Sequence, residues 1–379
     1  MRRPFLMLAA INVLDAFVTG AYMLIVPLVM IKRGIRLSTI GSVFSAFPIA
    51  FLAFRMLFSS AADSVGFRKF FHVNALCNLA SALLYAASLS PSSYAAAKMA
   101  QGVKEAALWA VNRSAAYEAA EDRSPQMASS ILLFTRALAI TIGAAASGFL
   151  ISWMSFEQVF LTLAALSALI FIPAWMSNMV QRGNLTLKEL FRKLDPRTMR
   201  GRTWRTALTM SLYTAASTLT AGFVLPLFLH ERGLGYWEVG MILAAYAGMG
   251  ALLLPYTLQA TPSMDRIACI QMLLYIPAAV LIPLTDGKLM IAMVMVMGLG
   301  ESISYITWES LISREAVGKE NMATTIGFLH APSNLVMIPS YIMAGVLVEE
   351  LGYTAPFLAA AALFSAYSVI ARRNLNKTS

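Results

Sequence analysis

The segment VPLVMIKRGIRLSTIG at residues 26–41 and the segment LPLFLHERGLGYWEVG at residues 225–240 together decide the fold. Aligned without a gap, they are offset by 199 residues, and most of their paired positions are both apolar. The more specific matches are Pro27 with Pro226, Leu28 with Leu227, Arg33 with Arg232, Gly34 with Gly233 and Gly41 with Gly240. Proline, arginine and glycine are not generic residues of apolar segments, so we interpret the match as an internal repeat.

A second pair of segments supports the repeat. MASS at residues 127–130 matches MATT from residue 322 onward, and each segment opens the fifth predicted helix of its half. Six helices followed by six that enter from the same side form a parallel repeat, related by an axis along the membrane normal. We therefore predict two six-helix halves, residues 1–180 and 206–379, joined by a linker at 181–205 and related by a pseudo-twofold axis.

The composition is that of an integral membrane protein. Of the 379 residues, 59% are hydrophobic and 13% are charged, with a mean hydropathy of +0.68, whereas a soluble protein carries about 25% charged residues. A helix needs about 20 mostly apolar residues to cross a bilayer, and such runs recur along the whole chain. We predict an all-α fold with twelve transmembrane helices at residues 5–30, 38–60, 70–89, 94–117, 127–151, 156–179, 206–229, 238–259, 267–285, 288–312, 323–348 and 353–371.

Basic residues predict the orientation of the chain. With the amino terminus inside, cytoplasmic segments hold 19 Lys and Arg residues and external loops hold five. Loops rich in Lys and Arg stay in the cytoplasm, so we predict a multi-pass protein of the cell membrane with both termini cytoplasmic. The external cluster of Lys32, Arg33 and Arg36 is a local violation of this rule. The net charge of +10 follows from the cytoplasmic loops and does not indicate nucleic-acid binding.

The linker has a pattern of its own. In residues 187–194 the apolar side chains recur with helical spacing and basic side chains lie between them. This pattern predicts an amphipathic helix on the inner membrane surface. A simple connection between the halves is the preferred interpretation, and a regulatory role is the alternative.

Three short motifs resemble those of the major facilitator superfamily, and the resemblance covers essentially the whole chain. The segment from Ser59 to Lys69 is similar to the family's loop signature, Gly-x-x-x-Asp-x-x-Gly-x-Arg-Lys, with serine at the first position. KMAQG at residues 98–102 resembles the Arg-x-x-Gln-Gly motif of the fourth helix, with lysine in place of arginine. GAAASG at residues 143–148 is a weak form of the antiporters' fifth-helix motif and lacks its proline. The corresponding loop of the second half, residues 262–266, has largely lost the signature.

The resemblance implies a rocker-switch transporter whose central cavity is lined chiefly by helices 1, 4, 7 and 10 of the twelve. It also implies a cytoplasmic gate in which the charges of the loop signature pair with an acid at the end of the fourth helix. Plain orientation and solubility are the alternative explanation for these charges. The gate residues are Asp63, Gly66, Arg68, Glu118 and Asp122.

Charged residues inside the predicted spans are functional candidates, because each costs at least about 2.5 kcal/mol on insertion scales. They are Asp15, Arg55, Lys98, Lys104, Glu105, Arg113, Arg136, Glu301 and Glu309. Residues three, four or seven apart share one face of a helix. The resulting stripes are Asn12, Asp15, Thr19 and Tyr22 on the first helix; Lys98, Glu105, Trp109 and Asn112 on the fourth, with Arg113 beside them; and Glu301, Tyr305 and Trp308 on the tenth.

The repeat relates these stripes to one another. Aligning the halves at Glu105 and Glu301 also pairs Trp109 with Tyr305, so the pseudo-twofold axis would place two carboxylates, each with an aromatic one turn away, across one cavity. We predict a cavity for substrate and protons with the following lining residues: Asp15, Asn12, Lys98, Glu105, Trp109, Arg113, Arg136, Thr214, Glu301, Tyr305 and Trp308.

Electrostatics suggests roles for the cavity charges. Desolvation and a nearby cation act on a carboxylate in opposite directions, so a carboxylate poised between them can take up a proton in one access state and release it in the other. We take Asp15 or Glu105 as the proton carrier, with Lys98, Arg113 or Arg136 as counter-charges. An Asp-containing first helix that ends at a proline also resembles the drug/proton antiporters of the family. The alternative is structural pairing, either Lys98 with Glu105 or Arg136 with an acid of the first or fourth helix.

The remaining buried charges receive different interpretations. Glu301 ranks with the two acids of the first half as a functional candidate. For Arg55, Lys104 and Glu309, which lie near span ends or off the stripes, snorkelling or packing between helices is the competing explanation.

The leading hypothesis is a monomeric secondary transporter that moves a small organic molecule by alternating access, coupled to protons and favouring efflux. Uptake of an organic anion or sugar is the runner-up, because the buried cations offer a site for an anionic substrate. A non-transporting receptor or scaffold on the same fold would place its function in the linker. An enzyme is disfavoured, because the sequence holds no metal-ligand cluster, no nucleophile–His–acid set and no phosphate loop, and we expect no cofactor.

Overall fold

The computed structural model describes residues 3–119, 125–177, 201–259, 264–316 and 322–376, which are helical apart from short connections. The chain divides into two compact units. Unit 1 comprises Met1–Ile35 and Val43–Asp195, and unit 2 comprises Arg36–Ser42 and Pro196–Ser379. The predicted boundaries of the halves stay a prediction, because most of the linker, including its expected amphipathic helix, lies outside the described residues.

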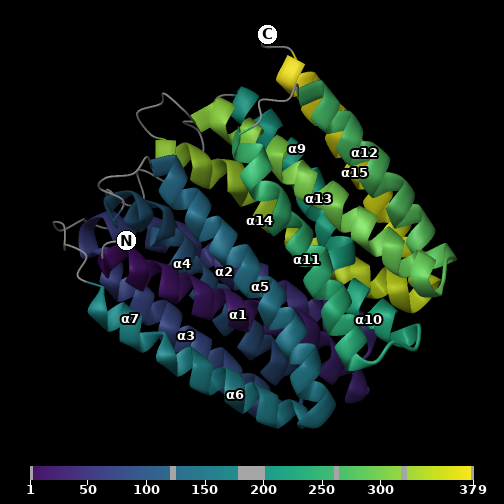
Figure 1. Ribbon diagram of the computed structural model, residues 1–379, viewed down its shortest axis with the longest axis horizontal. Helices are drawn as coiled ribbons and strands as arrows, with labels where there is room; N and C mark the ends of the chain where they lie inside the picture. The colour runs from purple at the N-terminus through teal and green to yellow at the C-terminus, as the bar shows by residue number, and fades with distance from the viewer. Residues whose placement is uncertain (1–2, 120–124, 178–200, 260–263, 317–321, 377–379) are drawn as a thin grey trace. The chain divides into compact units, whose positions relative to one another are not determined.

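The helices follow one another with short connections (Figure 1). The earlier ones are α1 (Arg3–Lys32), α2 (Leu37–Val65), α3 (Phe67–Ala87), α4 (Pro91–Ala119), α5 (Pro125–Trp153), α6 (Phe156–Leu169) and α7 (Phe171–Met176). The later ones are α9 (Gly201–Ala221), α10 (Val224–Glu231), α11 (Tyr236–Gln259), α12 (Met264–Leu281) with a 3-10 turn at Ile282–Leu284, α13 (Gly287–Ala316), α14 (Met322–Leu351) and α15 (Thr354–Asn376).

Ten helical segments in the described part of the chain are long and apolar enough to cross a membrane. Neither α4 nor α11 belongs to these ten. The α4 sequence carries five charged side chains, and several side chains of α11 are outside the described set. The total of twelve transmembrane helices therefore stays a prediction.

Prolines interrupt two of the predicted spans. Pro173 lacks the N–H that would bond the carbonyl of Leu169, and α6 ends at that residue. Pro226 likewise leaves the carbonyl of Gly222 without its helical partner, and the chain passes from α9 to α10 at residues 222–223. The spans expected at 156–179 and 206–229 are thus each built from two helices in sequence.

Two glycines set the crossing of α1 and α5 in unit 1. A Cβ on Gly20 would collide with the backbone of Ile140, and a Cβ on Gly143 would collide with the backbone of Phe17. The two backbones therefore touch, as is typical where small residues line a helix interface in a membrane. Because of this crossing, the helical turns that come just before it in α1 and in α5 also lie close to each other.

The same pattern of helix pairs recurs in the two units. In unit 1, α1 packs on α5, and α3 packs on both α4 and α6. In unit 2, α9 packs on α14, and α12 packs on both α13 and α15. In each unit the first and fifth helices thus form one packed pair, and the third helix packs on the fourth and the sixth.

The glycine crossing leads to a stability prediction. We expect Gly143→Ala to lower the free energy of unfolding by about 1–3 kcal/mol, because the added methyl forces the α1 and α5 backbones apart. Thermal unfolding of the purified protein in detergent measures the effect. Gly327→Ala on α14 is the matched control, since a Cβ there meets open space, and it should leave the midpoint unchanged or slightly raised. Equal midpoints for the two variants would contradict the role of the crossing.

Candidate functional site

Four charged side chains from three helices meet inside unit 1. Lys104 Nζ of α4 lies 2.9 Å from Asp15 Oδ1 of α1 and 3.0 Å from Glu105 Oε1. Arg136 Nη1 of α5 lies 2.6 Å from Asp15 Oδ2, and its Nη2 lies 2.9 Å from Glu105 Oε2. Each cation therefore bridges both carboxylates. We call these four residues the charge cluster.

The charge cluster is closed to solvent and electrically neutral. Asp15 and Lys104 are 0% exposed, Glu105 is 5% exposed and Arg136 is 6% exposed. Two positive and two negative charges cancel, which is what makes such a group tolerable at bilayer depth. Loss of any one member would leave a buried charge without compensation.

Polar neighbours complete the hydrogen bonding of the two carboxylates. Asn74 and Asn78 of α3 donate to Asp15 Oδ1 at 3.0 and 2.8 Å. The Trp109 indole N–H donates to Glu105 Oε2 at 2.9 Å, and the Arg136 guanidinium lies over the Trp109 ring, 5.2 Å from its centroid. Every carboxylate oxygen of Asp15 and Glu105 thus accepts a hydrogen bond, whereas Asn78 Oδ1 is buried without a partner among the described residues.

The structure corrects the roles predicted for two lysines. Lys98 is not a counter-charge of Glu105: its Nζ lies 3.1 Å from Gln101 Oε1 and 3.8 Å from the ring centroid of Phe44. Lys98 precedes Glu105 by seven residues, about 10 Å along the helix. Lys104, which was expected off the site's helical stripe, is the lysine that pairs with Glu105. Its long, flexible side chain lets the ammonium group reach a carboxylate that points from a different face of the helix.

α1 and α4 also meet through a pair of asparagine side chains next to the charge cluster. Asn12 and Asn112 donate to each other's side-chain oxygen at 2.7 and 3.0 Å, and both are buried. Arg113 follows on α4 and is half-buried. Within the described residues it forms no ion pair.

In unit 2, Glu301 of α13 lies in a different environment. Its carboxylate accepts hydrogen bonds from the Ser217 hydroxyl of α9 and the Tyr246 hydroxyl of α11. It makes no ion pair with any cation that the structure describes. Gly298, one turn earlier, allows this arrangement, since a Cβ there would lie 2.7 Å from the Tyr246 ring.

The other predicted residues of unit 2 have local contacts. The Trp308 ring lies 5.3 Å from that of Tyr213 and 5.6 Å from that of His330. The Thr214 hydroxyl donates to a carbonyl of its own helix at 3.3 Å, and Tyr305 is half-buried. Whether these residues and the charge cluster share one cavity stays a prediction.

The loop between α2 and α3 has the turn that its signature implies. Gly66 has a φ of +85°, which other residues adopt only with strain. The Arg68 guanidinium lies over the ring of Trp175 of α7, 5.0 Å from its centroid. The Asp63 side chain and the whole of Asp122 lie outside the described residues, so the pairing across the cytoplasmic gate stays a prediction.

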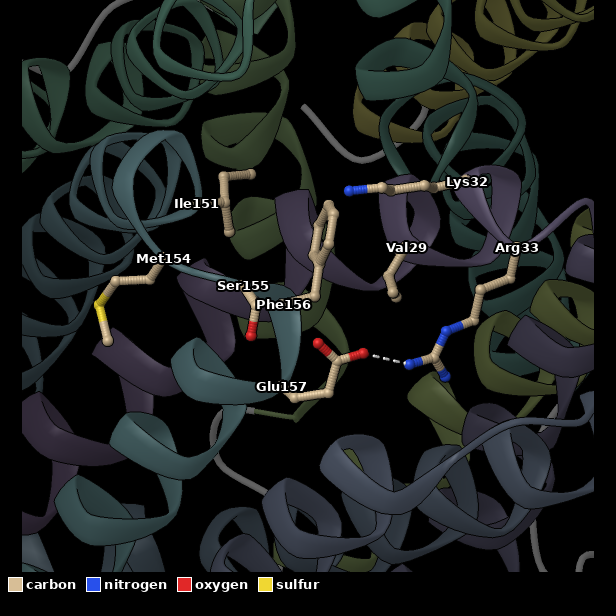
Figure 2. A pocket seen from close by; sticks show the side chains of 8 residues that line it. All are labelled: Val29, Lys32, Arg33, Ile151, Met154, Ser155, Phe156 and Glu157. Atoms are coloured by element: carbon tan, nitrogen blue, oxygen red, sulfur yellow. Dashed lines mark hydrogen bonds and ion pairs between the residues drawn. The ribbon is translucent and has the colours of Figure 1, made fainter.

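A pocket lies where α1 ends and α6 begins (Figure 2). Arg33 Nη2 lies 2.5 Å from Glu157 Oε1, and its Nη1 donates to the Tyr94 hydroxyl at 2.7 Å. Partial burial opposes the charged form of Arg33, but these hydrogen bonds raise the pKa of its guanidinium. Lys32 Nζ lies 5.1 Å from the ring centroid of Phe156. Two of the three residues that violate the positive-inside rule are thus held by partners in unit 1.

A family model supplies the observation that decides the family. The model described as Major Facilitator Superfamily matches residues 8–330. The chain belongs to the major facilitator superfamily. With its apolar helices, this membership makes it a multi-pass membrane protein. A comparison with curated protein sequences gives no match.

Solved structures of several transporters have the same fold. A POT family transporter in complex with 5-aminolevulinic acid is 13% identical, with a TM-score of 0.81 over 100% of this chain and 97% of that one. The nucleoside transporter NupG is 15% identical, with a TM-score of 0.75 over 99% and 100%. The human organic anion transporter MFSD10 (TETRAN) is 15% identical, with a TM-score of 0.70 over 98% and 99%.

Some residues of the site were not found from the sequence. Asn74 and Asn78 are two amides four residues apart in an apolar span, a signal that was present and unused. Ser217 and Tyr246 carry no such signal, because single hydroxyl residues are common in membrane helices of any function. Only the crossing of the helices shows that they meet Glu301.

The charge cluster leads to a double-mutant prediction. We expect Asp15→Asn and Lys104→Met each to lower the free energy of unfolding by about 3–5 kcal/mol, because each leaves an unpaired buried charge. The double variant restores neutrality and should recover much of that loss. Thermal unfolding in detergent measures all three variants against the unmodified protein. Additive losses in the double variant would show that the four charges do not act as one unit.

Proposed function

We propose that the chain is a secondary active transporter that moves a small organic molecule by alternating access, coupled to protons. Membership of the major facilitator superfamily supports transport, and the observation that carries the proton coupling is the contrast between the two units. Unit 1 holds two carboxylates neutralised by two cations, whereas Glu301 of unit 2 meets only hydroxyl groups among the described residues.

Charge balance assigns the two sites different roles. Adding a proton to Asp15 or Glu105 would leave a net positive charge enclosed in unit 1, which is costly in a low-dielectric interior. We therefore infer that the charge cluster is a fixed element that braces α1, α4 and α5. This inference moves the proton carrier away from the two acids that the sequence favoured.

Glu301 is the better proton carrier under the same reasoning. Without a cation, its carboxylate form leaves a half-buried negative charge, and uptake of one proton cancels that charge. The two hydroxyl groups that contact it can each donate or accept a hydrogen bond, so they can serve the carboxylate and the carboxylic acid in turn. A carboxyl group at bilayer depth with such adaptable partners is suited to binding and releasing a proton.

Direction and subtype rest on the sequence motifs. The acid in the first helix and the small-residue run of the fifth helix resemble drug/proton antiporters, so we propose efflux of the substrate in exchange for protons. The expected end of the first helix at Pro27 is wrong, because α1 continues through this proline to Lys32. The similar structures carry different cargoes, a nucleoside transporter and an organic anion transporter among them, and do not select one. We propose that the protein acts as a monomer in the cell membrane with both termini in the cytoplasm.

Substitution of Glu301 tests the coupling. In proteoliposomes with an imposed pH gradient of either sign, and with radiolabelled nucleosides, 5-aminolevulinic acid and ethidium as probes, the unmodified protein should drive accumulation of at least one probe. Glu301→Gln cannot exchange a proton and should reduce this accumulation by at least about tenfold. Glu309→Gln, two turns further along the same helix, is the matched control and should stay within about twofold of the unmodified protein.

The sign of the gradient separates the two directions of transport. Accumulation driven by protons moving opposite to the probe supports antiport, and accumulation driven by protons moving with it supports symport. Full gradient-driven accumulation by Glu301→Gln would rule out Glu301 as the carrier. No flux of any probe, with a function that depends on residues 181–205 instead, would favour a receptor or scaffold.

A further inference from the structure

Two half-buried arginines of unit 1 lie outside the charge cluster. Arg55 of α2 and Arg113 of α4 both lie within the spans predicted from the sequence, and both are half-buried. In the part of the chain that the structure describes, neither forms an ion pair with an acid. Charges at this depth need a partner or water to be tolerated. Among the described residues, the positive charge at this place is therefore not compensated by an acid.

The packing of α2 on α4 brings the two arginines to the same region. The helices touch at Gly102, where a Cβ would meet the backbone of Phe47 and Phe51. Because α3 returns between them, α2 and α4 run in the same direction. At about 1.5 Å per residue, Arg55 lies about 6 Å beyond Phe51 and Arg113 about 16 Å beyond Gly102. Arginine side chains are long enough to bring the two guanidinium groups near one another.

Neighbouring contacts fix which way this region of α4 faces. Glu105, Trp109 and Arg113 follow at intervals of four residues, so they share one face of the helix. Arg136 of α5 pairs with Glu105 and lies over the Trp109 ring, so this face points toward α5 in unit 1. Glu105 and Arg113 are both close enough to Arg55 to act electrostatically on its guanidinium.

Aromatic rings accompany both cations. The Arg55 guanidinium lies 5.2 Å from the ring centroid of Phe51, and Trp109 lies one turn before Arg113 on the same face. Guanidinium groups bind planar oxyanions through two parallel hydrogen bonds. Two such groups with flat apolar surfaces beside them form a site that matches an oxyanion attached to an aromatic body.

We propose that Arg55 and Arg113 bind the oxyanion of an organic substrate whose aromatic or apolar body lies along Phe51 and Trp109. The inference rests on the proposed function and names the substrate class of its transport site as organic anions, carboxylates or phosphate esters. Charge cancellation selects these two arginines over Arg136 and Lys104, whose charges are already neutralised by Asp15 and Glu105.

Equilibrium binding to the purified full-length protein in detergent tests the site. The probes are 1-naphthoate, 1-naphthyl phosphate and 1-naphthamide, which share one aromatic body and differ in the charged group, and isothermal titration calorimetry measures the affinity. At least one of the two anions should bind at least about tenfold more tightly than the uncharged amide. The stronger of the two anions identifies whether a carboxylate or a phosphate ester fits better.

Variants link the binding to the two arginines. Arg55→Gln and Arg113→Gln should each weaken anion binding by at least about tenfold. Arg113→Lys keeps the positive charge but loses the paired N–H donors of the guanidinium, so it should retain part of the affinity. Lys32→Gln is the matched control, because it removes a cation of unit 1 that lies over the Phe156 ring and is not part of the predicted cavity. It should change the affinity by less than about twofold.

Three results would overturn the anion site: equal affinity for anion and amide, unchanged affinity in both glutamine variants, or no binding of either anion. The unfolding midpoint without probe shows that each variant is folded. Binding in detergent needs no gradient, so it is measured independently of the coupling. Arginine-dependent binding without gradient-driven flux would therefore overturn the coupling alone. Gradient-driven flux of an uncharged probe without anion binding would overturn the anion site alone.

Discussion

The neutralisation of Asp15 and Glu105 by Lys104 and Arg136 is the interaction on which unit 1 depends. The bilayer supplies no water to an unpaired charge, so the three helices that carry these residues have to stay together once they are folded. The glycine contacts between α1 and α5 serve the same end, because they let the two backbones approach closely enough for short ion pairs. Backbone packing and charge pairing in this unit thus reinforce each other.

The sequence predicted much of the fold, because long apolar runs and the two copies of the Pro-Leu…Arg-Gly segment are strong one-dimensional signals. The family model and the solved structures confirm the family. The charges inside the helices were harder to assign. Helical spacing tells which residues share a face, and on that basis Lys98 seemed the partner of Glu105. Spacing does not tell how far a flexible side chain reaches or which turn of a neighbouring helix lies opposite, and those two facts make Lys104 the partner instead.

The repeat conserves positions more than environments. Glu105 and Glu301 lie at corresponding places in the alignment of the halves, and each is a buried or half-buried carboxylate on a helix of similar length. Around Glu105 the neighbours are cations and an indole, whereas around Glu301 they are hydroxyl groups. The difference arises partly on the helix that carries the acid, where Lys104 precedes Glu105 but Gly300 precedes Glu301, and partly on its neighbours, where Arg136 of α5 meets Glu105 and Tyr246 of α11 meets Glu301. Comparison of the two halves in sequence shows the first part, whereas the second depends on which helices lie next to each other.

The ion pair of Arg33 with Glu157 has a consequence for how the chain is made. The two residues are 124 positions apart, so in the predicted orientation the basic turn after α1 has to cross the bilayer long before its acidic partner has been synthesised. Until α6 emerges, three basic residues on the external side oppose the orientation that the remaining loops favour. In that orientation the first hairpin is inserted before the partner of Arg33 exists, and the ion pair can form only once the sixth span has arrived.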